Sequence, residues 1–139
     1  MKFFFPILLC FLFFCSFSQV KNDSNLVRNG KDVLVSFGKI TAKGSMTKEE
    51  ILKTDSLTIL APNGSASEYK IIGFATGVEE LGGDAEEYTT GNRLSERQKN
   101  LIMHTQEKHE IFIESITVKK NNLVKKLDCS FAITVTGPK

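Results

Sequence analysis

The segment from Tyr88 to Val135 constrains the fold of this chain more than any other part of its sequence. It starts with a polar loop that ends at Ser95, continues with a short amphipathic helix, and closes with two strands joined by Asn121-Asn122. Asparagine accepts the positive φ that a two-residue hairpin turn requires. A capped helix followed by a long hairpin predicts a compact folding unit. Because none of its side chains forms a catalytic motif, the unit favours a scaffold over a catalyst.

Two capping boxes mark where helices should begin. Thr47 and Glu50 form one, which predicts a short helix over 48–54. Ser95 and Gln98 form the other, which predicts a longer helix that ends near His109. The inner face of the longer helix is expected to carry Leu94, Leu101, Ile102 and Thr105.

Strand patterns fill most of the remaining sequence. Apolar residues alternate or cluster in five stretches, which predicts strands over 32–40, 56–61, 68–76, 111–119 and 123–136. The third stretch is apolar on both faces and is expected to be a central strand. A change of phase near Glu114-Ser115 predicts a β-bulge in the fourth. The last strand should face inward with Leu127, Cys129, Phe131, Ile133 and Val135.

The stretch 77–91 is acidic and bears glycines, so we expect a long loop with at most a short strand over 88–90. Together these elements predict one β-rich α+β domain. Its architecture would be sandwich-like antiparallel sheets with one short and one longer helix.

The first residues have the features of a secretory signal peptide. Lys2 supplies a positive start, an apolar stretch covers 3–14, and the small residues Ser16 and Ser18 predict cleavage before Gln19. The apolar stretch is shorter than the ~18 residues of a membrane span, so an uncleaved anchor is less favoured. We therefore expect no transmembrane span after cleavage.

A lipoprotein cut before Cys15 is a second alternative, but two phenylalanines precede that cysteine where a lipoprotein signal needs a small residue. The favoured organisation is a signal peptide at 1–18, a flexible arm at 19–30 and a single domain at 31–139. The expected location is the periplasm or the extracellular medium.

The cysteine content argues against a disulfide-stabilised scaffold, and the charge content argues against a nucleic-acid-binding protein. Cleavage would remove Cys10 and Cys15 and leave Cys129 alone, so the domain would have no internal disulfide. The 18 Lys and Arg residues and the 16 Asp and Glu residues give a net charge of 18 − 16 = +2. A charge of that size does not recruit nucleic acid.

Few side chains in the sequence are candidates for catalysis or for binding a metal. His104 and His109 lie about 140° apart around a helix, so they do not form a metal-binding pair. The acidic segment 79–87 lacks the alternating spacing of a calcium loop and is interpreted as solvated. Cys129 alternates inward and is expected to be an inert, buried thiol. We expect no catalytic residues, no metal and no cofactor, and a small hydrolase would need a triad or a metal cluster that the sequence lacks.

Lysines flank the predicted hairpin turn at Lys119, Lys120, Lys125 and Lys126. One interpretation is a solvated tip whose like charges discourage pairing with other strands. The other is a docking tip for an acidic protein or a lipid head group. The acidic segment 79–87 of a second copy would also suit these lysines, so a homo-oligomer stays open.

Five segments from Gly44 onward resemble, in order, the C-terminal periplasmic domain of the gliding-motility and type IX secretion protein GldM. These are Met46–Leu52, Glu68–Phe74, Gly91–Ile102, Ile111–Val118 and Leu123–Val135. Members of that family carry a transmembrane helix and several domains ahead of this module, whereas here we expect only a signal peptide and a short arm ahead of it. The turn Asn121-Asn122 also replaces a glycine-containing turn.

The resemblance implies a free-standing relative of the module that, in that family, reaches toward outer-membrane components. The leading expectation is therefore an exported, non-enzymatic interaction or scaffold module with an envelope protein partner. It would be associated with type IX secretion or gliding machinery. The alternative is a secreted inhibitor or small ligand-binding module on the same fold, because a fold does not fix a function. A deep pocket with convergent polar groups would favour that alternative.

Overall fold

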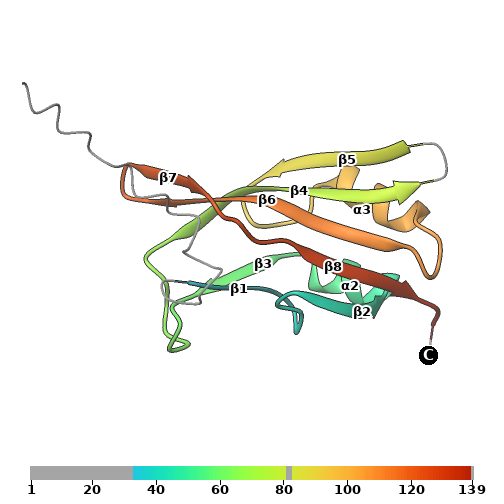
Figure 1. The fold of residues 1–139 in the computed structure, drawn as a ribbon, viewed down its shortest axis with the longest axis horizontal. Helices are drawn as coiled ribbons and strands as arrows, with labels where there is room; N and C mark the ends of the chain where they lie inside the picture. The colour runs from blue at the N-terminus through green and yellow to red at the C-terminus, as the bar shows by residue number, and fades with distance from the viewer. Residues whose placement is uncertain (1–32, 81–82, 139) are drawn as a thin grey trace, which may run out of the picture.

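Residues 33–80 and 83–138 are described by the structure, which is a computed structural model. The expected signal peptide at 1–18 and the arm at 19–30 lie outside the described residues. The described chain forms two sheets and two helices (Figure 1), which confirms the predicted β-rich α+β class. Its elements are β1 Leu34–Phe37, β2 Lys43–Thr47, α2 Lys48–Thr54, β3 Leu57–Leu60, β4 Lys70–Glu80, β5 Gly83–Thr90, α3 Glu96–His104, β6 Glu110–Lys120, β7 Leu123–Lys126 and β8 Phe131–Thr136.

The larger sheet has six strands in the order β2-β8-β6-β4-β5, with β7 also paired to β6. All of its pairings are antiparallel except that of β2 with β8, which is parallel. The smaller sheet is the antiparallel pair of β1 and β3. The parallel pairing brings 43–47, a segment for which no strand was predicted, to one edge of the larger sheet.

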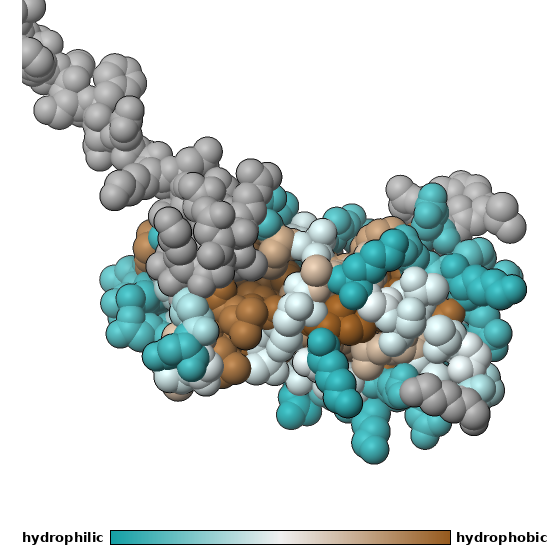
Figure 2. Space-filling model, turned by 60° about the horizontal axis from the view of Figure 1, so that its bottom comes forward, coloured by the Kyte–Doolittle hydropathy of each residue, from teal (hydrophilic) through white to brown (hydrophobic). Residues whose placement is uncertain are grey.

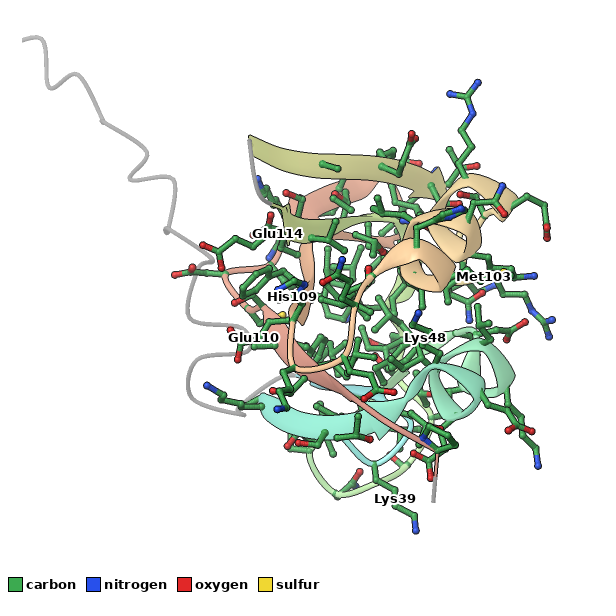
Figure 3. All side chains as sticks on the ribbon, turned by 90° about the vertical axis from the view of Figure 1, so that its right-hand side faces the viewer. Lys39, Lys48, Met103, His109, Glu110 and Glu114 are labelled. Atoms are coloured by element: carbon green, nitrogen blue, oxygen red, sulfur yellow. The ribbon has the colours of Figure 1, made fainter. Side chains whose placement is uncertain are left out.

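Both helices lie on the same face of the larger sheet, with Glu114 on its other side (Figure 3). The ammonium of Lys48 on α2 donates to the Met103 carbonyl of α3 at 2.8 Å, so the two helices are joined directly. The hydrophobic core fills the space between the helices and the larger sheet. Its largest fully buried side chains include Phe37, Phe74, Phe131, Ile51, Leu57 and Ile102.

Both predicted capping boxes are present, and α2 has the predicted bounds. The longer helix is shorter than predicted, because α3 ends at His104 rather than near His109. Thr105 adopts an extended conformation there, and its hydroxyl donates to the Leu101 carbonyl at 2.9 Å. This bond satisfies a carbonyl that the ended helix would leave unpaired. No helix within the described residues has both the length and the apolar character needed to cross a membrane.

The prediction of a long acidic loop over 77–91 is wrong. β4 and β5 form a continuous hairpin from the pair Gly73–Thr90 to the pair Glu80–Gly83. β4 is central, as predicted, with β6 on its other side. The sequence pattern did not indicate β5, because β5 is an edge strand with few apolar residues. Pairing with β4, rather than its own composition, holds it in an extended conformation.

The predicted bulge in β6 is confirmed. Ala75 pairs with Glu114 while Gly73 pairs with Thr117, so β6 carries one extra residue, and Ser115 has a φ of 54°. The single strand predicted over 123–136 is wrong, because the chain leaves the sheet after Lys126 and returns at Phe131. This break lies along the bulged part of β6, where a regular ladder cannot continue.

Candidate interaction site at the hairpin tip

The hairpin of β6 and β7 forms one end of the molecule, opposite the C-terminus (Figure 1). Asn121 and Asn122 form the turn, and Asn121 has a φ of 53°. The two strands pair from Lys120–Leu123 to Thr117–Lys126. The structure thus confirms the predicted two-residue turn and brings all four predicted lysines onto one hairpin.

The register divides these lysines between two faces of the hairpin. Directly paired residues share a face, and successive residues alternate between faces. Lys119 and Lys126 therefore lie on the outward face of the larger sheet, and Lys70 of β4, paired with Lys119, joins them there. Lys120 and Lys125 lie on the opposite face. The predicted cluster is thus two smaller basic surfaces, and Lys70 was not predicted.

Lys120 is held in place by two neighbours from the segment before β4. Its ammonium forms an ion pair with the Glu68 carboxylate and lies 5.5 Å from the centre of the Tyr69 ring. The hydrogen bond and the charge of Lys120 lower the pKa of the exposed Glu68. The outward face, which carries Lys70, Lys119 and Lys126, is therefore the more basic of the two.

Two aliphatic side chains are exposed beside these lysines. Leu123 is 50% exposed and Val124 is 53% exposed. The other exposed large hydrophobic residues in the described part of the chain are Leu34, Tyr88 and Met103. Figure 2 shows hydrophobic surface between hydrophilic residues on the underside of the molecule as well. Leu123 and Val124 are neighbours in the sequence between pairs of lysines, but Val124 lies on the outward face with Lys119 and Leu123 lies on the opposite face with Lys120.

Sequence reasoning missed these two residues because it counted them as part of one long strand. The signal was present in the run Lys119-Lys120-Asn121-Asn122-Leu123-Val124-Lys125-Lys126. Two aliphatic residues that follow a turn and precede lysines are at the end of a hairpin, beyond the core. Their neighbour Leu127, by contrast, is buried.

The other candidate residues lie apart from the tip. His104 is exposed, and its Nδ1 is 2.7 Å from the Asn100 carbonyl oxygen. Cys129 is half-buried, and burial together with the charge of Asp128 raises the pKa of its thiol to about 11. Among the residues that the structure describes, no three His, Cys, Asp or Glu side chains are placed to hold a metal ion.

The surface also has open hollows. One of about 340 Å³ lies on the outward face of the larger sheet, lined in part by Glu79, Glu86 and Glu114. A second, of about 460 Å³, lies beside the first turn of α2 and includes Glu107. A third, of about 420 Å³, lies between β3 and the start of β4. All three open broadly to solvent, unlike the deep pocket expected of a small-molecule site.

The fold and the tip together define a small β-rich α+β domain that presents a basic and partly apolar hairpin. No protein-family model matches this chain, and no curated protein matches it.

Proposed function

We propose that this protein is an exported, non-enzymatic interaction module that binds an envelope protein partner through the tip of the β6–β7 hairpin. The observation that carries the proposal is the exposure of Val124 beside Lys119 on the outward face of the tip. Burying exposed aliphatic surface against a partner contributes roughly 25 cal/mol per Å². Lysines around an apolar patch speed the approach of an acidic partner and orient it.

The outward face of the tip is the proposed contact surface. Val124 pairs with Lys119 on that face, and Lys70 and Lys126 lie beside them. A complementary partner presents carboxylates around an apolar depression. On the opposite face, Lys120 already has the Glu68 carboxylate as its partner, which lowers the attraction of that face for an acidic surface.

The resemblance to the GldM C-terminal domain extends this proposal to a location and a machinery. On that basis the module acts in the periplasm or outside the cell, and its partner belongs to the type IX secretion or gliding apparatus. The proposed location and machinery rest on the residue patterns of the five segments, because no family model and no curated protein matches this chain.

Photo-crosslinking from the tip tests the proposal. A benzophenone amino acid is placed at position 124 and, as a matched control, at the exposed position Lys53 on α2. After illumination in the native envelope, adducts are identified by mass spectrometry. We expect a distinct protein adduct from position 124 only. Recovery of secretion-ring proteins would support the proposed machinery.

Charge reversal then tests the role of the lysines. Lys119→Glu/Lys126→Glu alters the outward face, and Lys39→Glu/Lys53→Glu makes the same change of charge elsewhere. We expect the first pair to reduce the adduct by about tenfold or more and the second to leave it unchanged, because only the first pair lies beside the proposed contact. Equal adducts from both crosslinker positions, or equal effects of both charge reversals, would refute the proposal.

A further inference from the structure

The outward face of the larger sheet carries opposite charges at its two ends. Figure 3 shows both helices on one face of this sheet and Glu114 on the other, outward face. The acidic end surrounds the hollow of about 340 Å³, and its carboxylates belong to Glu79, Glu86 and Glu114. The basic end lies at the hairpin tip, and its ammonium groups belong to Lys70, Lys119 and Lys126. Among the described residues, none of these six side chains forms an ion pair.

The β-bulge in β6 places both ends on the same face. This strand buries four side chains against the core, which are Ile111, Ile113, Ile116 and Val118. Strict alternation would bury position 115 instead of 116, and the extra residue at Ser115 accounts for the change. Glu114 and Lys119 are five positions apart and would otherwise lie on opposite faces, but both face outward. A register shift near the start of β4 has the same effect on Lys70 and Glu79.

The surface between the two ends is uncharged. Gly73 and Ala75 of β4 lie in its centre, and both are buried beneath side chains of neighbouring strands. Tyr88 reaches across from β5, and its hydroxyl lies over Gly73, where an added Cβ would overlap it. Tyr88 nevertheless remains 55% exposed. The centre of the face thus offers an aromatic ring for contact between two oppositely charged ends.

The chain itself carries the surface that the basic tip requires. The tip is complementary to carboxylates around an apolar depression. The hollow at the acidic end meets both conditions, since its three carboxylates surround Gly77, Ala85 and the half-buried Phe112. The charges of this face therefore favour a second copy of the chain as its occupant.

We infer that the outward face binds the same face of a second copy, through a twofold axis that crosses the strands near Tyr88. Rotation about this axis reverses the direction of the strands, so each basic end lies on the acidic end of the other copy. Because both ends are matched at once, the contact closes as a dimer and does not propagate into a fibre. Sheets that pack face to face are about 10 Å apart, a gap that lysine and glutamate side chains span together.

The size of the face is that of a weak dimer interface. β4 has eleven residues, so the face is about 35 Å long at roughly 3.3 Å per residue. Strands about 4.8 Å apart make it about 15 Å wide on average, which gives a flat area of about 500 Å². A standard interface buries roughly 800 Å² per partner. We therefore expect a dissociation constant of about 1–100 µM.

This inference rests on the proposed function, because it uses the same face of the hairpin tip. The second copy covers Lys119 and Val124 until an envelope partner displaces it. The dimer and the complex with that partner are therefore mutually exclusive, and the dimer keeps the apolar part of the tip away from solvent before the partner is met.

Sedimentation velocity of the purified protein over a range of concentrations tests the dimer. Glu79→Lys/Glu86→Lys makes the whole face basic, and Lys70→Glu/Lys119→Glu makes it acidic. Each variant alone should dimerise at least about tenfold more weakly than wild type, because like charges then meet at one pair of ends. Added salt should also weaken the wild-type dimer, since screening at 1 M ionic strength acts within about 3 Å. Circular dichroism verifies that both variants remain folded.

Mixing the two variants is the sharpest test. A wholly basic face and a wholly acidic face match at both ends, so an equimolar mixture should form a heterodimer at least as tight as the wild-type dimer. Lys39→Glu/Lys53→Glu is the matched control, because it has the net charge of the acidic-face variant but an unchanged outward face. It should dimerise like wild type and should bind the basic-face variant at least about tenfold more weakly than the acidic-face variant does.

Three results would overturn the inference. The protein could remain a monomer up to about 1 mM, well above the expected dissociation constant. The two face variants could fail to associate when mixed, or the control could bind the basic-face variant as tightly as the acidic-face variant does. An adduct from position 124 to another envelope protein would stand in each case, so the proposed function would survive. A dimer in solution, combined with an adduct in the envelope that contains only this chain, would support the inference and refute the envelope partner.

Discussion

Replacement of the buried Gln98 should destabilise the protein more than any other exchange of a polar residue on α3. Its side chain is fully buried, and its amide joins the helix to both strands of the β4–β5 hairpin. Its Nε2 donates to the Glu87 carbonyl at 3.0 Å and to the Phe74 carbonyl at 3.4 Å. Its Oε1 accepts the Ser95 N–H at 3.0 Å as part of the capping box.

Gln98→Leu keeps a similar volume and removes all three bonds. A buried donor or acceptor left without a partner costs about 1–3 kcal/mol. The bonds to Ser95 and Glu87 are the two short ones, so we expect a loss of about 2–4 kcal/mol in the free energy of unfolding. This is a large part of the roughly 5–15 kcal/mol that stabilises a typical domain.

Urea unfolding followed by far-UV circular dichroism measures the loss. Gln106→Leu is the control, because Gln106 is exposed just beyond the end of α3 and should change stability by less than about 0.5 kcal/mol. If the two substitutions cost the same, the amide of Gln98 does not join the helix to the hairpin in the way argued.

Gln98→Glu tests the direction of the bonds. It replaces the Nε2 donor by a carboxylate oxygen that faces two carbonyl oxygens, so the pKa of the new carboxyl should be raised. A group with a raised pKa contributes most stability below its unfolded pKa, about 4.3 for glutamate, and loses it as pH rises. The deficit relative to wild type should therefore be smallest below about pH 4. A deficit that does not depend on pH would contradict the assignment.

Three further predictions follow from single positions. Gly73→Ala should cost about 1–3 kcal/mol, because its Cβ would overlap the Tyr88 hydroxyl and lie 2.9 Å from the Thr89 carbonyl oxygen. Gly77→Ala on the same strand, whose Cβ would have contacts of 3.7 and 3.8 Å, is the control in the same urea assay. Cys129, with its thiol pKa raised to about 11, should react with iodoacetamide about 100-fold more slowly at pH 8 in the folded than in the urea-unfolded chain, as measured by peptide mass spectrometry. Asn121→Val should cost about 1–2 kcal/mol and Asn121→Gly almost nothing by thermal unfolding, because position 121 has a positive φ.

Features that depend on neighbours in the sequence were predictable. The capping boxes at Thr47 and Ser95 and the turn at Asn121 each rest on a side chain or a φ angle within a few residues. The bulge at Ser115 was also visible, because it reverses the alternation of apolar residues in its own strand. In each case the physical cause lies within one element.

Features set by pairing between distant segments were not predictable. β5 is extended because it pairs with β4, although its composition resembles a loop. β2 is a strand because it lies beside β8, a segment that follows it by almost ninety residues. Gln98 was recognised as half of a capping box, but its bonds to Phe74 and Glu87 depend on where the hairpin lies.

The candidate site shows the same division. The sequence placed four lysines at one tip, but alternation along paired strands puts adjacent lysines on opposite faces. Lys70 lies beside Lys119 only because of the register between β4 and β6. Glu68 forms an ion pair with Lys120 only because the segment before β4 runs beside the tip. Counting the lysines near a turn in the sequence therefore overestimates the positive charge on the one face of the hairpin that a partner contacts.

The strands of this protein differ in how their exposed edges are protected from pairing with other chains. Exposed strand edges invite pairing with other chains, and charged side chains are a common protection. The edge strands of the larger sheet have such residues, with Lys43 on β2, Glu86 on β5 and Lys126 on β7. β1 and β3 have no charged residue in either strand. The outer edge of β3 is instead covered in part, by Asn92 at one end and by the turn that bonds Ala61 to Ser65 at the other. Because the chain itself bridges this edge, at Leu57 through Asn92 and at Leu60 through Ala66, β3 resists edge-to-edge association without charged residues of its own.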